Sequence, residues 1–108
     1  MAAVFDLTPG QQIESCSGAA LLAHQGDGNV VVYHEGVARW ATNTAGLTTA
    51  KLSMQTNGNL VLYGPANEVR WSSGTGTSPG AWAAVQDDCN LVVYLGGTPL
   101  WASASTCH

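Results

Sequence analysis

The sequence predicts an all-β domain built from three copies of one sheet-forming unit. Three observations predict it: a segment that repeats about every thirty residues, runs of β-branched and aromatic residues in each copy, and no stretch with convincing helical periodicity. The chain has 108 residues, of which 45% are hydrophobic and 13 are Gly. It is therefore too apolar for a disordered chain and too Gly-rich for a helical bundle, and its length fits a single domain over residues 1–108.

The repeated segments span residues 20–33, 51–63 and 81–94, and each ends in Tyr. Their Gln residues, at 25, 55 and 86, lie 30 and 31 positions apart, and a Trp follows each Tyr after seven or eight residues. The full repeats cover about 17–46, 47–77 and 78–108, after an N-terminal lead-in. Together they fill nearly the whole chain, so the fold is expected to have internal threefold symmetry.

Each repeat predicts about three strands. The runs at 29–33, 59–63 and 90–94 have strand composition. Asp27-Gly28 and Asn57-Gly58 before them predict type I′ hairpin turns, whereas Asp88-Cys89 in the third copy fits that turn less well. Further turns at 35–36, 64–65 and 96–97 lead to a short strand that carries the Trp. Polar and Gly-rich loops at 42–49 and 72–80 connect the units.

The core is expected where the three sheets face a common axis, because one small sheet cannot bury its apolar face alone. Strand side chains alternate faces, so Val30 and Val32, with their counterparts in the other copies, point inward. The once-per-repeat Trp residues are expected to fill the axis rather than to form a ligand platform: Trp40, Trp71 and Trp101. Trp82 has no counterpart, so its placement stays open.

Charge restricts the partners. Charged residues make up 9% of the chain, the formal net charge is −4, and only Arg39, Lys51 and Arg70 are basic. This balance excludes a nucleic-acid interface and disfavours anionic membranes, and the apolar runs are too short to span a bilayer. A neutral ligand is expected. Residues 1–9 do not resemble a secretory signal, so the chain is expected to be cytoplasmic, or secreted and supplied as the mature form.

The other face of each motif strand carries hydrogen-bonding groups around a small apolar patch. Amides, carboxylates and phenols can form hydrogen bonds with the hydroxyls of a sugar, and the Val can pack against its C–H surfaces. A single Asp or Asn beside a hairpin usually serves the turn. A turn does not need Gln four residues before Asn and Tyr four after it, although a repeat-wide structural constraint remains an alternative. The candidate residues are Gln25, Asp27, Asn29, Val31, Tyr33, Gln55, Asn57, Asn59, Val61, Tyr63, Gln86, Asp88, Asn90, Val92 and Tyr94.

The triplicate pattern Gln-x-Asp-x-Asn-x-Val-x-Tyr, with the flanking segments 39–44 and 52–55, resembles the bulb-type, snowdrop-agglutinin-like mannose-binding lectins. The resemblance covers essentially the entire chain. It implies a β-prism II fold, with three four-stranded antiparallel sheets around a pseudo-threefold axis. It also implies a lectin for mannose and mannose-rich glycans that uses no metal or other cofactor, and a homodimer formed by exchange of C-terminal strands, here from the tail 102–108.

The resemblance implies a role for each motif residue. Asp and Asn bind the axial 2-hydroxyl of mannose, Gln the 3-hydroxyl and Tyr the 4-hydroxyl, while Val packs on ring carbons. Asn57 replaces the family's Asp, so the second site is expected to bind mannose more weakly. The family's usual disulfide positions hold Gly28 and Ala50. A Cys16–Cys107 clamp, or three free thiols with Cys89, are the alternatives.

Two other function classes compete. The first is a protein-interaction, defence or bacteriocin-like toxin module on the same scaffold. The second is an enzyme, against which the residues argue: Asp87 and Asp88 are adjacent and point apart, so they make a poor glycosidase pair. His24, His34 and His108 lack a recognisable Ser or Cys nucleophile. Asp27-x-Asn29 begins like a calcium loop, but the rest of that motif does not follow.

Overall fold

The computed structural model describes residues 2–4 and 6–106, and in this part of the chain all regular structure is β. No helix in these residues is long and apolar enough to cross a membrane. The strands are β1 (Ala2–Val4), β2 (Asp6–Leu7), β3 (Gln12–Glu14), β4 (Leu21–His24), β5 (Val30–His34), β6 (Val37–Ala41), β7 (Lys51–Met54), β8 (Leu60–Tyr63), β9 (Val69–Ser72), β10 (Trp82–Val85), β11 (Leu91–Leu95) and β12 (Thr98–Ala102).

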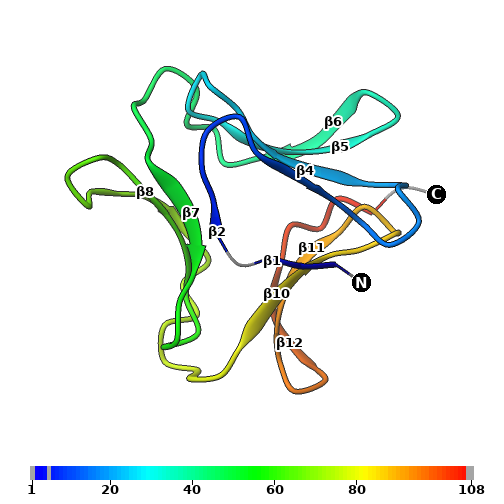
Figure 1. Ribbon diagram of the computed structural model, residues 1–108. Helices are drawn as coiled ribbons and strands as arrows, with labels where there is room; N and C mark the ends of the chain where they lie inside the picture. The colour runs from blue at the N-terminus through cyan, green and yellow to red at the C-terminus, as the bar shows by residue number, and fades with distance from the viewer. Residues whose placement is uncertain (1, 5, 107–108) are drawn as a thin grey trace.

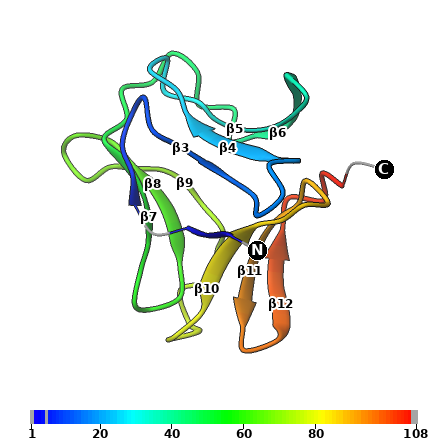
Figure 2. The same ribbon diagram turned by 45° about the vertical axis from the view of Figure 1, so that its right-hand side comes forward.

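The strands form three four-stranded antiparallel sheets around a common axis (Figure 1). Their orders are β3-β4-β5-β6, β2-β7-β8-β9 and β1-β10-β11-β12. This arrangement confirms the all-β, β-prism II prediction. Each repeat supplies three consecutive strands of one sheet, and the fourth strand of every sheet comes from the N-terminal lead-in. The lead-in runs past all three sheets in turn (Figure 2), which the repeat pattern alone did not predict.

The inward faces of the middle strands form the core, as predicted. Period-two alternation sends two aliphatic side chains of each strand toward the axis, and all of them have no exposed surface. They are Val30, Val32, Leu60, Leu62, Leu91 and Val93. Leu22, Leu52 and Val85 of the strands beside them are equally buried. The three sheets therefore share one apolar interior, which none of them encloses alone.

The three repeated Trp residues pack against this core and against one another. Their ring centroids lie 5.3 Å (Trp40–Trp71), 5.5 Å (Trp40–Trp101) and 5.1 Å (Trp71–Trp101) apart. The interplanar angles of 67° to 72° make every contact edge-to-face, the arrangement that aligns ring edges with ring faces. The prediction that the three Trp residues pack in the interior holds in part, because the rings pack against the buried core but each Trp is itself only half-buried.

The predicted type I′ turns are wrong. The Gln25 backbone N–H donates to Asn29 O at 2.8 Å and the Gly28 N–H to Gln25 O at 3.1 Å, which makes a three-residue loop. A type I′ turn needs positive φ at Asp27, but only Gly28 has it, at 94°. This pattern is a type I turn followed by one left-handed residue. Gly is required there for space as well, because a Cβ on Gly28 would lie 2.0 Å from Leu47 O.

Candidate functional site

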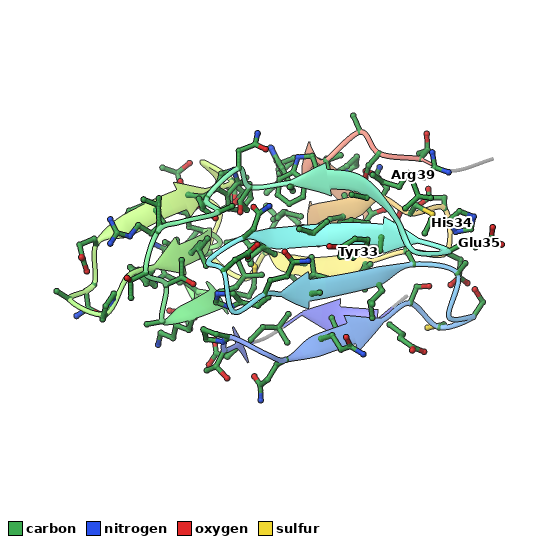
Figure 3. The ribbon with its side chains drawn as sticks, turned by 90° about the horizontal axis from the view of Figure 1, so that it is seen from above. Tyr33, His34, Glu35 and Arg39 are labelled. Atoms are coloured by element: carbon green, nitrogen blue, oxygen red, sulfur yellow. The ribbon has the colours of Figure 1, made fainter. Side chains whose placement is uncertain are left out.

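The first and last residues of each motif meet on the outer face of their sheet. Strand pairing sets Leu21 opposite Tyr33 and Ala23 opposite Val31, so the Gln that follows β4 lies on the same face of the sheet as the Tyr of β5. The Gln25 amide nitrogen donates a hydrogen bond to the Tyr33 hydroxyl, and the same bond joins Gln55 to Tyr63 and Gln86 to Tyr94. Figure 3 shows Tyr33 on this outer face, apart from His34, Glu35 and Arg39 near the end of the β5–β6 hairpin.

The second motif residue has a structural role in its turn. Asp27 Oδ1 accepts the Asn29 backbone N–H at 2.9 Å. Asn57 and Asp88 accept the corresponding N–H groups at 3.0 Å. All three side chains are exposed. Turn chemistry therefore explains one oxygen of each residue, and the second carboxylate oxygen of Asp27 and Asp88 is a further acceptor that Asn57 lacks.

The motif Asn is held by its oxygen. Asn29 Oδ1 accepts both the Thr42 hydroxyl and the Thr44 backbone N–H at 3.2 Å. Asn59 Oδ1 accepts equivalent bonds from Ser73 and Thr75, and Asn90 Oδ1 accepts the Ser103 hydroxyl at 2.9 Å. An Asn held in this way offers a ligand its two amide hydrogens, so the motif supplies a positioned donor beside an exposed acceptor.

Sequence reasoning missed the residues that hold the Asn. They follow each Trp in the pattern Trp-x-Ser/Thr-x-Ser/Thr, at Thr42 and Thr44, Ser73 and Thr75, and Ser103 and Ser105. The second member of each pair donates to the backbone oxygen of the turn residue before the Asn, as Thr44 does to Gly28 O at 2.6 Å. This second triplicate pattern was visible in the sequence and was the signal that could have found them.

The motif Val contributes little exposed surface. Val31, Val61 and Val92 keep only 3%, 2% and 3% of their area accessible. The apolar patch expected from them is therefore small.

The third copy carries an aromatic residue that the others lack. Trp82 stacks on Tyr94, with ring centroids 4.9 Å apart and an interplanar angle of 25°, and its Nε1 donates to Gly96 O at 3.2 Å. Strand register gives Trp82 the same position as Leu21 and Lys51, each opposite its own motif Tyr. Trp82 therefore lies on the outer face, at a position that holds a different residue in each copy.

The third turn is also tied to another repeat. Asp87 Oδ1 accepts the Ser17 backbone N–H at 2.9 Å. That bond, with hydroxyl bonds from Ser17 and Ser15, lowers the pKa of the Asp87 carboxyl from 3.8. Asp87 thus fixes the third motif turn to the β3–β4 connection.

Two of the three histidines, His24 and His34, are held by hydrogen bonds. His24 is buried, with Nδ1 2.8 Å from Leu7 O and Nε2 2.8 Å from Thr49 Oγ1, so it links the lead-in to the repeats. His34 Nδ1 lies 2.6 Å from Ala19 O. His108 lies outside the described residues.

Known proteins are similar in sequence to most of this chain. A protein named mannose-specific lectin from Aloe arborescens is 39% identical over 84 residues, which are 75% of each chain. The chain belongs to the bulb-type, snowdrop-agglutinin-like lectin family. A second protein with that name, from Galanthus nivalis, is 49% identical over 51 residues, 46% of this chain and 32% of its own. No protein-family model matches the sequence.

Solved structures agree with the architecture of this bulb-type lectin. A Marasmius oreades lectin has a TM-score of 0.84 at 28% identity, over 93% of this chain and 85% of its own. The snowdrop lectin, solved with methyl-α-D-mannoside, has a TM-score of 0.68 at 37% identity, over 97% and 100%. A Mycobacterium smegmatis lectin, described as a domain-swapped dimer, has 0.56 at 36%, over 94% and 95%. The relatives are lectins, a class that binds carbohydrate.

Both predictions for the cysteines of this bulb-type lectin, the Cys16–Cys107 clamp and three free thiols, are wrong. Cys89 is disulfide-bonded and fully buried, so three free thiols are excluded. A bond to Cys89 within the chain uses one of the other two cysteines, so the Cys16–Cys107 clamp is wrong as well; Cys107 itself lies outside the described residues. Cys89 has a φ of 70°, at the turn position that Gly28 and Gly58 occupy in the other copies. Spacing alone did not predict this, because side-chain partners depend on which segments meet.

Proposed function

We propose that this lectin binds mannose and mannose-rich glycans through its three motif sites, without a metal ion. The observation that carries the proposal is the triplicate geometry: a Gln–Tyr hydrogen bond, an exposed acceptor and an Asn held by its oxygen, on each outer sheet face. The names of the Aloe and Galanthus relatives and the mannoside in the snowdrop structure support the same ligand.

The motif residues divide the hydroxyls of the sugar among them. Asp27 and Asp88 accept from the 2-hydroxyl, for which Asn57 is a weaker acceptor, and the motif Asn donates to it. Gln25 and its counterparts bind the 3-hydroxyl, Tyr33 and its counterparts the 4-hydroxyl, and the nearly buried Val limits the depth of the site. An epimer of mannose moves one hydroxyl, so the residue that binds this hydroxyl loses its hydrogen bond. This loss is the source of specificity.

Binding at one site is expected to be weak and binding to a polyvalent glycan strong. A shallow site with a few hydrogen bonds gives a Kd of about 1 mM, equivalent to roughly 4 kcal/mol. Three sites on one chain raise avidity by roughly 10²-fold where the glycan spans them.

A site-resolved titration tests the proposal. The side-chain amide resonances of Gln25, Gln55 and Gln86 report one site each. Methyl-α-D-mannoside is expected to shift all three, whereas the glucoside, with an equatorial 2-hydroxyl, shifts none at the same concentration. Tyr33→Phe is expected to weaken binding about fivefold at Gln25 only, because one hydrogen bond is lost. Equal responses to both sugars would refute the proposal. Capture of a glycoprotein that mannose does not block would favour the protein-interaction or toxin module.

We further propose that residues 1–108 act as one non-catalytic binding domain that forms a homodimer by exchange of C-terminal strands. The Mycobacterium smegmatis lectin, described as a domain-swapped dimer, supports the exchange. So does the position of β12 at the edge of its sheet, with Leu100 of that strand 37% exposed. Light scattering is expected to give twice the mass of one chain, and a single-chain mass at all concentrations would exclude the dimer.

A further inference from the structure

The residue opposite the motif Tyr has a different chemical character in each copy. Strand register places one residue of the preceding strand opposite each of these Tyr side chains. In chain order the residues are Leu21, Lys51 and Trp82. Of the three, the indole is the flat ring that can stack on a phenol. The Tyr of the third copy therefore has a neighbour of a kind that the first and second copies lack.

Trp82 is held at two points. Its ring stacks on Tyr94, with the ring centroids 4.9 Å apart and an interplanar angle of 25°. Its Nε1 donates to Gly96 O at 3.2 Å, in the turn between β11 and β12. Both aromatic side chains are half-buried. The indole thus joins the Tyr to the hairpin turn and confines the Tyr94 ring on the side from which β10 approaches.

Tyr94 is fixed at both ends of its side chain. Its hydroxyl accepts the Gln86 amide, a bond that all three copies share, and its ring has the stacking contact in addition. The first copy differs, because Tyr33 borders a cavity of about 350 Å³ that Leu21 also lines. The hydroxyl of Tyr33 is anchored in the same way, while space remains beside its ring.

The turn at the other end of the third motif is also tied to the rest of the chain. Asp87 Oδ1 accepts the Ser17 backbone N–H at 2.9 Å. Cys89, between Asp88 and Asn90, is disulfide-bonded and fully buried. Both ends of the third motif are therefore restrained before a ligand arrives.

Prior order at a binding site raises its affinity. A hydrogen bond from a Tyr hydroxyl to a sugar requires one orientation of the side chain, and side chains that become immobilised on binding reduce affinity. A Tyr that is already confined avoids part of this loss. The expected gain is about threefold in Kd, within the range for one immobilised side chain.

We propose that Trp82 is a positioning residue for the third motif site. By stacking on Tyr94 it orders the hydroxyl that receives the sugar, and this makes the third site the tightest of the three for a mannose unit. Trp82 acts through Tyr94 and does not itself contact the sugar. The proposal rests on the proposed function, because the sugar must occupy the motif.

The test is a titration of the intact chain with methyl-α-D-mannoside, read at the side-chain amides of the motif Gln residues. The Kd at Gln86 is expected to be about threefold lower than at Gln25. Trp82→Leu, which installs the residue of the first copy, is expected to raise the Kd at Gln86 about threefold and leave the other two sites unchanged. Trp82→Phe keeps a ring that can stack and is expected to retain most of the affinity.

A second measurement separates positioning from stability. In the sugar-free chain, carbon relaxation of the Tyr rings is expected to show Tyr94 more ordered than Tyr33, and Trp82→Leu is expected to remove the difference. Leu21→Ala is the matched control, because Leu21 holds the same register position beside the first site. It is expected to change the Kd at Gln25 by less than about twofold, since no stacked ring is lost.

The positioning role is refuted if Trp82→Leu leaves the Kd at Gln86 unchanged or weakens all three sites equally. It is also refuted if Trp82→Phe loses as much affinity as Trp82→Leu, or if Tyr94 is no more ordered than Tyr33 in the free chain. If the mannoside shifts none of the motif Gln amides, the proposed function fails and the positioning role fails with it. If it shifts them and Trp82→Leu has no effect, the positioning role alone fails.

Discussion

The inner and outer faces of the three sheets differ in how closely they follow the threefold repeat. On the inner face, equivalent positions hold aliphatic side chains with no exposed surface, and three Trp rings meet at nearly equal distances. On the outer face, the residue opposite the motif Tyr is Leu21, Lys51 or Trp82. The interior must be filled to the same density by every copy, whereas a side chain that faces solvent is free to differ. The outer face thus keeps the motif in all three copies but varies the residue opposite its Tyr, whereas the inner face stays aliphatic throughout.

The largest effect is expected from breaking the inner face. Trp71→Ala removes one ring from a cluster in which each ring contacts the other two, and should lower the free energy of unfolding by about 3–4 kcal/mol. Denaturant titration measures the loss. Val69→Ala, on the same strand but 63% exposed, is the control and should cost less than about 0.5 kcal/mol. Equal losses would show that the Trp cluster is not a core element.

The second test concerns the turn that the third copy builds differently. Gly58 has a φ of 94°, and a Cβ there would lie 2.0 Å from Ser78 O. Gly58→Ala should destabilise the chain by about 3 kcal/mol, from the left-handed backbone and the displaced loop together. Gly46→Ala isolates the backbone part: its φ is 90° but nothing lies within 4 Å, so about 1–2 kcal/mol is expected. Equal losses of stability in the two variants would mean that the loop around Ser78 moves away from the new Cβ at no cost.

A third test makes the second site more like the other two. Asn57→Asp keeps the acceptor for the Asn59 N–H and adds a charge, so mannoside affinity at the Gln55 amide should rise by about threefold to tenfold. Asp27→Asn is the reciprocal change and should weaken the first site to a similar degree. If neither variant alters the affinity of its own site, charge at this position does not distinguish the copies.

The smallest effect concerns the attachment of the third turn to the first repeat. The folded-state pKa of Asp87 lies below 3.8, so the unfolded chain binds more protons in this range. The stabilisation is present at neutral pH and is lost as pH falls through the folded pKa. Between neutral pH and about pH 3, the denaturation midpoint should therefore fall less for Asp87→Asn than for the original chain. If both proteins lose the same stability in acid, the loss comes from other carboxylates.

Most of the fold was predictable because it depends on local patterns. The alternation of inward and outward side chains around Val30 and Val32 identified the core. The Trp that recurs at positions 40, 71 and 101 located the axis. The type I′ prediction failed because a dipeptide such as Asp27-Gly28 fits more than one loop length, and the hydrogen bond between Gln25 and Asn29 selects among them. The Ser/Thr residues that hold the motif Asn escaped notice because they are distant in sequence, 13 to 16 positions away.

The sequence by itself determined the all-β class, the threefold repeat, the apolar interior and the motif residues, because each is expressed as a spacing within one segment. Tertiary structure alone decided which segments become neighbours. It brought the lead-in to every sheet as a fourth strand, placed Gln12 two strands from Val31, and set Leu21, Lys51 and Trp82 in one equivalent position. The physical reason is that strand pairing joins residues far apart along the chain, and hydrogen-bonded register, rather than local composition, fixes which side chains share a face.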